Sequence, residues 1–276
     1  MIIIGGGELT KKIETSNQNL DLFKIRGTKT NNEIYAGKNL NNIQNVEIPK
    51  GNNLCIINWS HQFIKNFEHL KYAIEGVENI SKFMLENPKL NYIYISSTSA
   101  NLSFNYKSLY GLYKFLSENI LKDVSKNKKI NLNIIRLGLM YGTKNCPIKK
   151  IYKYRKYGIK ILVGNPEAKF SVTSADEVAK KILEPESEIW HFRENESYFI
   201  DSKNVSINYI HQIFNKKGNI NDLLTLKIKN NDLIHKLSNL FGKKIDLSLA
   251  EQDRYPSLFD NINFSGSCLE NYILGI

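Results

Sequence analysis

Residues 1–10 read MIIIGGGELT, and this stretch decides the fold. A short apolar run ends in three glycines, and the segment from Glu8 to Ser16 that follows can be helical. This is the strand, turn, helix order of a βα unit. Backbone N–H groups of such a turn can approach a pyrophosphate, whose charge is favoured by the positive end of the helix. We therefore expect Gly5, Gly7, Glu8 and Leu9 to bind a cofactor.

The turn departs from the G-x-G-x-x-G dinucleotide fingerprint at one position. It keeps two of the three glycines, and Thr10 stands where the third would be. The third glycine normally allows close packing of helix on strand. Glycine triplets also occur in plain tight turns, so a purely structural role for Gly5 to Gly7 stays open.

Outward from this turn, apolar runs alternate with helical patterns. We predict strands at 20–26, 54–59, 90–96 and 132–142, and helices at 69–85 and 109–124. Strands that are continuous apolar runs and alternate with helices indicate a parallel sheet covered on both faces. The polar, Asn-rich connection before residue 54 is too short and irregular for a full extra helix.

Beyond Gly142 the periodicity loosens. We expect a short basic helix at 150–158, strands at 161–164 and 197–202, and a helix at 174–183 that begins with a capping box. The predicted fold class is α/β, a doubly wound parallel sheet (Rossmann) with a small, partly discontinuous C-terminal substrate lobe. Residues 1–142 would form the dinucleotide-binding domain, with 171–190 packing back on it, and residues 143–276 mainly the substrate-binding lobe.

Composition narrows the classes of partner. The chain has 276 residues, is 42% hydrophobic and carries a formal net charge of +11. Its lysines are scattered instead of forming a stripe, so we expect anionic small ligands and not nucleic acid. Cys55, Cys146 and Cys268 are in no metal-ligand spacing, which argues against a disulfide framework and a zinc site. No apolar run is long enough for a bilayer and no leader is evident, so we expect a cytoplasmic protein without a membrane partner.

The residue that ends the second strand indicates the cofactor. An acidic residue there would accept hydrogen bonds from a free ribose 2′-hydroxyl, whereas an arginine would pair with a 2′-phosphate. Here the strand closes with Arg26 and no carboxylate. The sequence therefore favours NADP, with NAD as the alternative, although an arginine at a surface loop is usually just solvated.

The stretch NYKSLYGLYK, residues 105–114, carries a candidate proton-transfer pair in Tyr110 and Lys114. Positions i and i+4 share one face of a helix, so the ammonium can lie beside the phenol and favour its ionised form. The ordinary pKa of tyrosine is about 10, so a cation and a bound nicotinamide are needed to lower it toward working pH. Taken alone this spacing is common, and a solvated surface face is the plain alternative.

The order of the motifs is more specific than any one of them. A glycine turn at the first strand, a hydroxyl cluster in YISSTSA at 94–100, Tyr110-x-x-x-Lys114 and RLGLMYG at 136–142 resemble the extended short-chain dehydrogenase/reductase family, the NAD-dependent epimerase/dehydratase group. The stretch AIEGVENI at 73–80 and FSVTSADEVAKKIL at 170–183 are similar to further family segments. The resemblance covers roughly residues 1–215.

The resemblance implies roles for individual residues. Ser97, with Thr98 as the fallback, would orient the reacting oxygen, Tyr110 would be the acid/base, and Lys114 would tune it and hold the ribose. The remaining cofactor contacts would come from residues at later strand ends, namely Asn58, Trp59, Leu137, Gly138 and Leu139. No metal site is implied.

The resemblance also implies an activity: an NAD(P)-dependent oxidoreductase or epimerase that acts on a sugar, in particular a nucleotide-sugar, by 4-keto reduction or epimerisation. Ser99-Ala100 stand where family dehydratases carry an acidic pair, so 4,6-dehydration is not expected. Departures at Thr10 and Ala73 leave one alternative, a non-catalytic NAD(P)-binding regulator of the same fold. A homodimer through the two long helices is a further candidate.

Overall fold

The computed structural model describes residues 1–16, 21–27, 34–59, 64, 66–101, 109–144, 146–163, 166–167, 169–184, 197–198, 202–217, 223–228 and 267–275. The chain divides into two compact units. The first comprises Met1–Leu137 and Asp176–Ile200, and the second comprises Gly138–Ala175 and Asp201–Ile276. The chain therefore crosses between the units three times.

The first unit is built on a seven-stranded parallel sheet in the order β10-β6-β5-β4-β1-β2-β3. The strands are β1 (Ile2–Gly5), β2 (Phe23–Arg26), β3 (Ile34–Tyr35), β4 (Leu54–Asn58), β5 (Asn91–Ser97), β6 (Leu132–Leu137) and β10 (Ser197–Tyr198). From β1 the sheet grows to β2 and β3 on one side and to β4, β5 and β6 on the other. The strand order thus reverses between β1 and β4, which is where open α/β sheets bind ligands.

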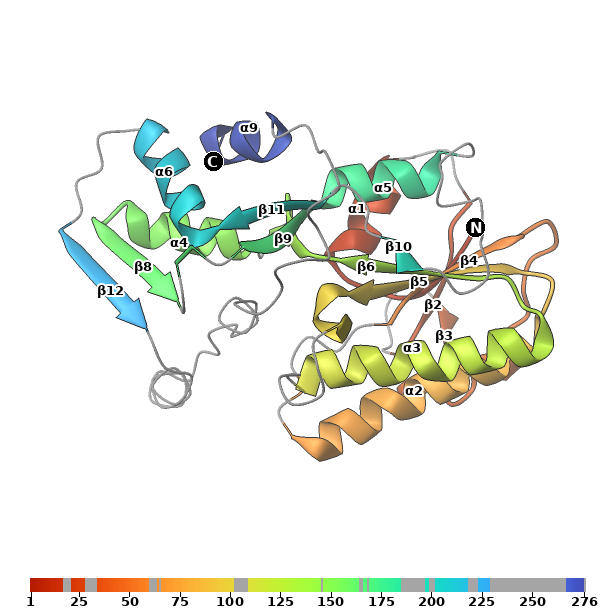
Figure 1. The fold of residues 1–276 in the computed structure, drawn as a ribbon. Coiled ribbons are helices and arrows are strands. Elements are labelled where there is room, and N and C mark those ends of the chain that lie inside the picture. The colour runs from red at the N-terminus through yellow and green to blue at the C-terminus, as the bar shows by residue number, and fades with distance from the viewer. Residues whose placement is uncertain are drawn as a thin grey trace. The chain divides into compact units, whose positions relative to one another are not determined.

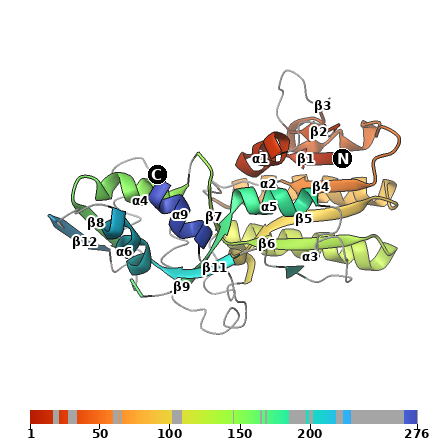
Figure 2. The ribbon, with the colours of Figure 1, turned by 90° about the horizontal axis from the view of Figure 1, so that it is seen from above.

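Helices cover both faces of this sheet. Helices α1 (Glu8–Ser16) and α5 (Ala175–Leu183) lie on one face, and α2 (Phe67–Glu86) and α3 (Leu109–Lys128) lie on the other (Figures 1 and 2). An ion pair of 2.7 Å between Lys12 and Asp176 connects α1 to α5. The start of α2 is capped by the side chain of Asn66, which accepts a hydrogen bond from the backbone N–H of His69 at 2.9 Å.

The core explains why the first strands are continuous apolar runs. Ile2, Ile3 and Ile4 are all fully buried, because the sheet has helices on both sides. Between the sheet and the helices α2 and α3, a cluster of buried side chains includes Val77, Ile80 and Phe83 of α2 together with residues of β1, β4, β5 and β6. The predicted fold class is confirmed.

The structure differs from the sequence prediction at 132–142, where it has two strands instead of one. Strand β6 ends at Leu137, and β7 (Leu139–Tyr141) pairs with β9 (Lys169–Ser174) in a different sheet. Gly138 separates them, and a Cβ there would lie 2.4 Å from the carbonyl oxygen of Ser171. The close approach of the Ser171 backbone requires glycine at the point where the chain leaves the first unit.

The second unit contains two small sheets. Strands β7 and β9 are joined by β11 (Ser202–Ser206), which runs antiparallel to β9, while β8 (Ile159–Val163) pairs in parallel with β12 (Leu224–Ile228). The helices are α4 (Pro147–Arg155), α6 (Ile207–Lys217) and α9 (Ser267–Gly275). The basic helix thus begins and ends three residues earlier than 150–158. Within the described ranges, no helix has the length and apolar character that a membrane crossing requires.

The connection between β3 and β4 agrees with the sequence prediction. It contains only two short 3-10 turns, η1 (Lys38–Leu40) and η2 (Ile43–Asn45), and no α-helix between residues 34 and 54. The edge of the sheet beyond β2 is therefore a two-residue strand followed by turns.

Candidate functional site

The glycine turn lies at the carboxyl end of β1, beside the point where the strand order reverses. Gly5 has φ +92° and Gly7 has φ +127°, conformations that side-chain-bearing residues rarely adopt. A Cβ on Gly5 would also lie 2.4 Å from the carbonyl oxygen of Asn58, the residue that ends β4. The turn is therefore specified by both backbone conformation and the close approach of two strand ends.

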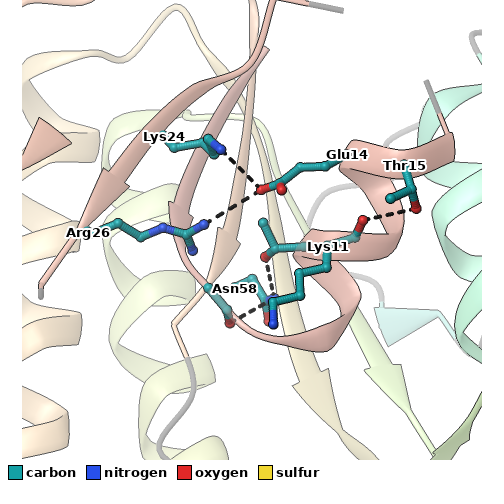
Figure 3. Close-up of polar contacts among 8 residues, drawn as sticks. Lys11, Glu14, Thr15, Lys24, Arg26 and Asn58 are labelled. Atoms are coloured by element: carbon teal, nitrogen blue, oxygen red, sulfur yellow. Dashed lines mark hydrogen bonds and ion pairs between the residues drawn. The ribbon is translucent and has the colours of Figure 1, made fainter. Parts of the chain in front are cut away.

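The structure gives Thr10 a role in this turn. Its side chain is fully buried, and its hydroxyl accepts a hydrogen bond of 2.9 Å from Nδ2 of Asn58. The same Nδ2 lies 3.2 Å from the carbonyl oxygen of Gly6, to which it also donates. Figure 3 shows Asn58 beneath the start of α1. Asn58, which was predicted to contact the cofactor, thus holds the turn in place. The Thr10 hydroxyl connects α1 to β4 at the position where the fingerprint has its third glycine.

Arg26 lies directly on the glycine turn. Its Nη1 is 2.1 Å from where a Cβ on Gly6 would be, so the guanidinium packs against the Gly6 backbone. Its Nη2 is 3.7 Å from Oε1 of Glu14 on α1, and Nζ of Lys24 is 3.5 Å from the same oxygen (Figure 3). The Arg26 cation therefore borders the turn, which favours an anionic ligand there.

Glu8 and Leu9 begin α1. Glu8 is partly buried, and its carboxylate forms an ion pair of 3.9 Å with Lys11. The Leu9 side chain is buried in the protein core, so any contact of this residue with a dinucleotide would use its backbone N–H. Backbone N–H groups of the glycine turn and the start of α1 are the kind of donors that a pyrophosphate needs, and their contact with a cofactor stays a prediction.

Trp59 follows β4 and its ring is almost fully buried. A Cβ on Gly27 would lie 2.6 Å from the indole, and a Cβ on Gly76 of α2 would lie 2.5 Å from indole Nε1. Nε1 is 3.4 Å from the carbonyl oxygen of Ala73, to which it donates. Two glycines thus make room for the ring between β2 and α2. The predicted cofactor contact of Trp59 stays a prediction.

Lys114 is buried with only 1% of its surface exposed. Its Nζ donates hydrogen bonds to the carbonyl oxygens of Ile95 at 2.8 Å and Trp59 at 3.3 Å. The ammonium also lies 4.8 Å from the ring centroid of Tyr94 and 5.3 Å from that of Tyr113, within cation–π range. Lys114 therefore bridges the carboxyl ends of β4 and β5.

The electrostatic environment brings this lysine close to neutrality at physiological pH. Burial lowers the pKa of Lys114 from its ordinary 10.5 to about 7, and the carboxylate of Glu118 opposes that shift. A lysine with such a pKa exchanges protons near pH 7, which an exposed lysine does not. The candidate site thus contains a titrating amine at strand ends adjacent to the glycine turn.

Ser97 ends β5 and is partly buried. Its Oγ accepts a hydrogen bond of 3.3 Å from the backbone N–H of Ser99, in the 3-10 helix η3 (Thr98–Asn101). A Cβ on Gly111 would lie 2.7 Å from the Ser99 carbonyl oxygen, so α3 packs closely on η3. This contact brings the strand end that carries Ser97 to the helix turn that carries Tyr110. The fallback residue Thr98 is buried.

Tyr110 is partly buried on the first turn of α3, one turn before Lys114. Its ring centroid is 6.4 Å from that of Tyr113, at an interplanar angle of 44°. Tyr110 packs against the hydrophobic cluster of the first unit. The structure thus places Ser97, Tyr110 and Lys114 on adjoining elements, and their joint action on a substrate stays a prediction.

The remaining predicted contacts lie around Gly138. Leu137 ends β6 and is buried in the first unit. Gly138 and Leu139 belong to the second unit, where the Gly138 N–H donates to the Thr173 hydroxyl at 3.0 Å. Their relation to the glycine turn stays a prediction.

Sequence reasoning missed three residues at this site. The carboxylate of Glu118 on α3 is 1% exposed and accepts hydrogen bonds from Ser96 at 2.5 Å and from Arg136 Nε at 2.8 Å and Nη2 at 2.5 Å. The spacing Lys114-x-x-x-Glu118 was a usable signal, since it predicts a shared helix face. Successive side chains along a strand point to opposite faces, and this alternation would have predicted different partners for Ser96 and Ser97.

Comparisons with known proteins show the fold. No protein-family model and no curated protein sequence matches the chain. Solved structures do: a UDP-N-acetylglucosamine 4-epimerase from Methanobrevibacter ruminantium in complex with UDP-N-acetylmuramic acid has a TM-score of 0.68 at 15% identity, covering 99% of this chain and 95% of its own. A Thermotoga maritima UDP-glucose 4-epimerase with UDP-glucose has a TM-score of 0.64 at 14% identity, covering 91% and 96%.

A third similar structure is a UDP-N-acetylglucosamine 4-epimerase from Bacillus cereus, with a TM-score of 0.61 at 18% identity and coverage of 91% of this chain and 96% of that one. The chain shares the fold of these nucleotide-sugar epimerase structures. At these identities the likeness establishes the fold.

Proposed function

We propose that this protein is an NAD(P)-dependent enzyme that acts on a nucleotide-sugar, by epimerisation or 4-keto reduction. The observation that carries the proposal is geometric: Tyr110 and the buried Lys114 lie one turn apart on α3, which packs closely on the segment that follows Ser97. The similar structures with UDP-N-acetylmuramic acid or UDP-glucose support the substrate class.

In the proposed reaction, Tyr110 gives a proton to the sugar oxygen or takes one from it, and Ser97 donates a hydrogen bond to that oxygen. The Lys114 ammonium favours the ionised phenol, because an opposite charge stabilises the deprotonated form of an acid. When bound, a nicotinamide dinucleotide supplies the hydride acceptor and donor. The glycine turn would hold the diphosphate part of that cofactor.

Cofactor choice depends on Arg26 in this proposal. Solved structures with the same fold contain NAD, among them MoeE5 with UDP-glucose and NAD. We propose NADP for this chain because β2 ends in an arginine with no carboxylate following it on the described strand end. Replacement of Arg26 by Ala should weaken NADPH binding roughly tenfold or more while leaving NADH binding nearly unchanged, since a charge-assisted bond contributes about 1.5–3 kcal/mol.

Lys24→Ala is the matched control for that titration. Lys24 lies on the same strand and pairs with the same carboxylate, Glu14. If Arg26→Ala and Lys24→Ala change the ratio of NADPH to NADH affinity equally, the specificity comes from general positive charge and not from Arg26.

Activity is tested by incubating the protein with either dinucleotide and a panel of UDP-sugars and their 4-keto forms, followed by separation of the products. Wild type should convert at least one member, and Tyr110→Phe should bind cofactor but lose turnover by at least a hundredfold. Equal turnover in both proteins would remove Tyr110 from the mechanism. Cofactor binding without conversion of any panel member would favour the non-catalytic regulator.

The division of labour between the two units is also a proposal. We assign dinucleotide binding to the first unit, because it contains the glycine turn and the reversal of strand order. Substrate recognition would then belong mainly to the second unit. A homodimer through α2 and α3 is a candidate assembly that sedimentation of the purified protein would test.

A further inference from the structure

Glu118 is a buried carboxylate whose partners come from three different elements. On β5 it accepts a hydrogen bond from Ser96, the residue before Ser97. On β6 it accepts two from Arg136, at 2.8 and 2.5 Å. On its own helix, Nζ of Lys122 lies 3.8 Å from Oε2. A carboxylate that is 1% exposed needs such partners, because an unpaired buried charge is costly.

These contacts connect the two sides of the candidate site. Ser96 and Ser97 are consecutive on β5. The Ser96 bond to Glu118 therefore anchors the end of β5 to α3 one residue before Ser97. The same helix carries Tyr110 and Lys114, two turns and one turn before Glu118.

Glu118 also acts on Lys114 through charge. Burial disfavours the ammonium, and the Glu118 carboxylate, one turn away on the same buried side of α3, favours it. Other titratable or charged groups face this region from the packed elements, namely Tyr94 of β5, Tyr110, Tyr113 and Lys122 of α3, and Arg136 of β6. Burial raises the pKa of Tyr94 and Tyr113, so neither supplies a negative charge near neutral pH. Among the described groups named here, Glu118 is therefore the one that brings a negative charge toward Lys114.

We propose that Glu118 is a positioning residue of the site: it fixes the strand end that carries Ser97 against the helix that carries Tyr110, and its negative charge acts on the Lys114 amine one turn away. Its role in turnover rests on the proposed function above. Its effect on Lys114 does not, because the protonation of the amine can be followed in the ligand-free protein.

The test begins with a pH titration of Lys114 in the ligand-free protein, measured by NMR of lysines labelled at Cε. The spectrum of Lys114→Arg assigns the Lys114 signal. Wild type should titrate near pH 7. In Glu118→Gln the midpoint should fall by about one pH unit, since an opposite charge nearby is removed. In Ser96→Ala the midpoint should stay within about 0.3 unit, because the charge of Glu118 remains.

Arg136→Gln separates charge from simple disruption. It breaks the same ion pair as Glu118→Gln but leaves the carboxylate less neutralised, so the Lys114 midpoint should rise instead of fall. If both variants move the midpoint in the same direction, or if Glu118→Gln leaves it in place, the proposal is overturned. Circular dichroism of each variant establishes that it is folded. If Arg136→Gln unfolds, Glu118→Asp replaces it as the comparison, because aspartate keeps the charge. The Lys114 midpoint in Glu118→Asp should stay above that in Glu118→Gln.

Turnover provides the second measurement. If the ammonium is the active form, a midpoint that moves from about 7 to about 6 lowers kcat/KM roughly ninefold at pH 8 but only about twofold at pH 6. Ser96→Ala should lower kcat by an amount that does not depend on pH. A uniform loss across pH in Glu118→Gln would contradict the charge role. Absence of any activity in wild type would refute the proposed function alone, because the NMR titration still decides the effect of Glu118 on Lys114.

Discussion

Replacement of Lys114 by methionine should change how the stability of this protein depends on pH. Burial lowers the pKa of the amine to about 7 in the folded state, whereas an unfolded chain exposes it with its ordinary value of 10.5. Between these two values the unfolded state binds more protons than the folded one, so folding stability rises with pH. Below pH 7 both states are protonated, and the penalty of burying the charge is fully present.

The magnitude follows from the same two values. A difference of three to four pKa units corresponds to a penalty on the order of 5 kcal/mol at low pH, with about 2 kcal/mol of it relieved between pH 7 and pH 9. Methionine has no charge to bury and fills a similar volume, so the stability of Lys114→Met lacks this pH-dependent penalty. The free energy of unfolding of wild type minus that of the variant should therefore increase by about 2 kcal/mol over this range.

Urea unfolding of both proteins at pH 7, 8 and 9 measures that difference. Staying below pH 9.5 avoids ionisation of tyrosines in the unfolded chain, which lowers stability as pH rises because burial raises the pKa of Tyr94 and Tyr113. Lys82→Met, at an exposed position on α2, is the matched control and should show a flat difference. If the difference for Lys114→Met is equally independent of pH, the claim that burial lowers the pKa of this amine is refuted.

Three substitutions test the packing around the glycine turn and around the Trp59 ring. Gly5→Ala should destabilise the fold by at least about 2 kcal/mol in urea unfolding, because φ is +92° and the new Cβ would lie 2.4 Å from the Asn58 carbonyl oxygen. Thr10→Val removes the acceptor of a buried 2.9 Å hydrogen bond from Asn58 and should cost about 1 kcal/mol; no loss would contradict the anchoring role of the hydroxyl. Gly76→Ala places a Cβ 2.5 Å from the Trp59 indole nitrogen, so it should shift the indole fluorescence and cost about 1–3 kcal/mol, and an unchanged emission spectrum would argue against that contact.

The fold class could be predicted from sequence because its signal is local. Apolar runs such as Ile2 to Ile4 and the helical spacing of 69–85 each reflect burial of a single element, and the glycine turn follows the first strand directly. The break at Gly138 could not be predicted in the same way. It depends on the backbone of Ser171, which is far along the chain and approaches within 2.4 Å of the position a Cβ would occupy.

The candidate site was only partly predictable for the same physical reason. The i, i+4 spacing places Tyr110 and Lys114 on one helix face, but it does not show that the amine reaches the carbonyl oxygens of Ile95 and Trp59. Sequence likewise predicts a cation at Arg26 but not its position over Gly6, which depends on how β2 packs beside α1. Contacts between elements require the fold before they can be assigned.

The central claim is that a sugar hydrogen passes to a nicotinamide while Tyr110 moves the proton. The most direct measurement is a single turnover with UDP-glucose, or the panel member that proves active, carrying deuterium at C4, followed by acid quench and mass analysis of the dinucleotide. Wild type loaded with oxidised cofactor should transfer the deuterium to the dinucleotide, and Tyr110→Phe should not. In an epimerisation the deuteride returns to C4, so the quench times span the turnover. Conversion of the sugar with no labelled dinucleotide at any of these times, or equal labelling in both proteins, would contradict the account.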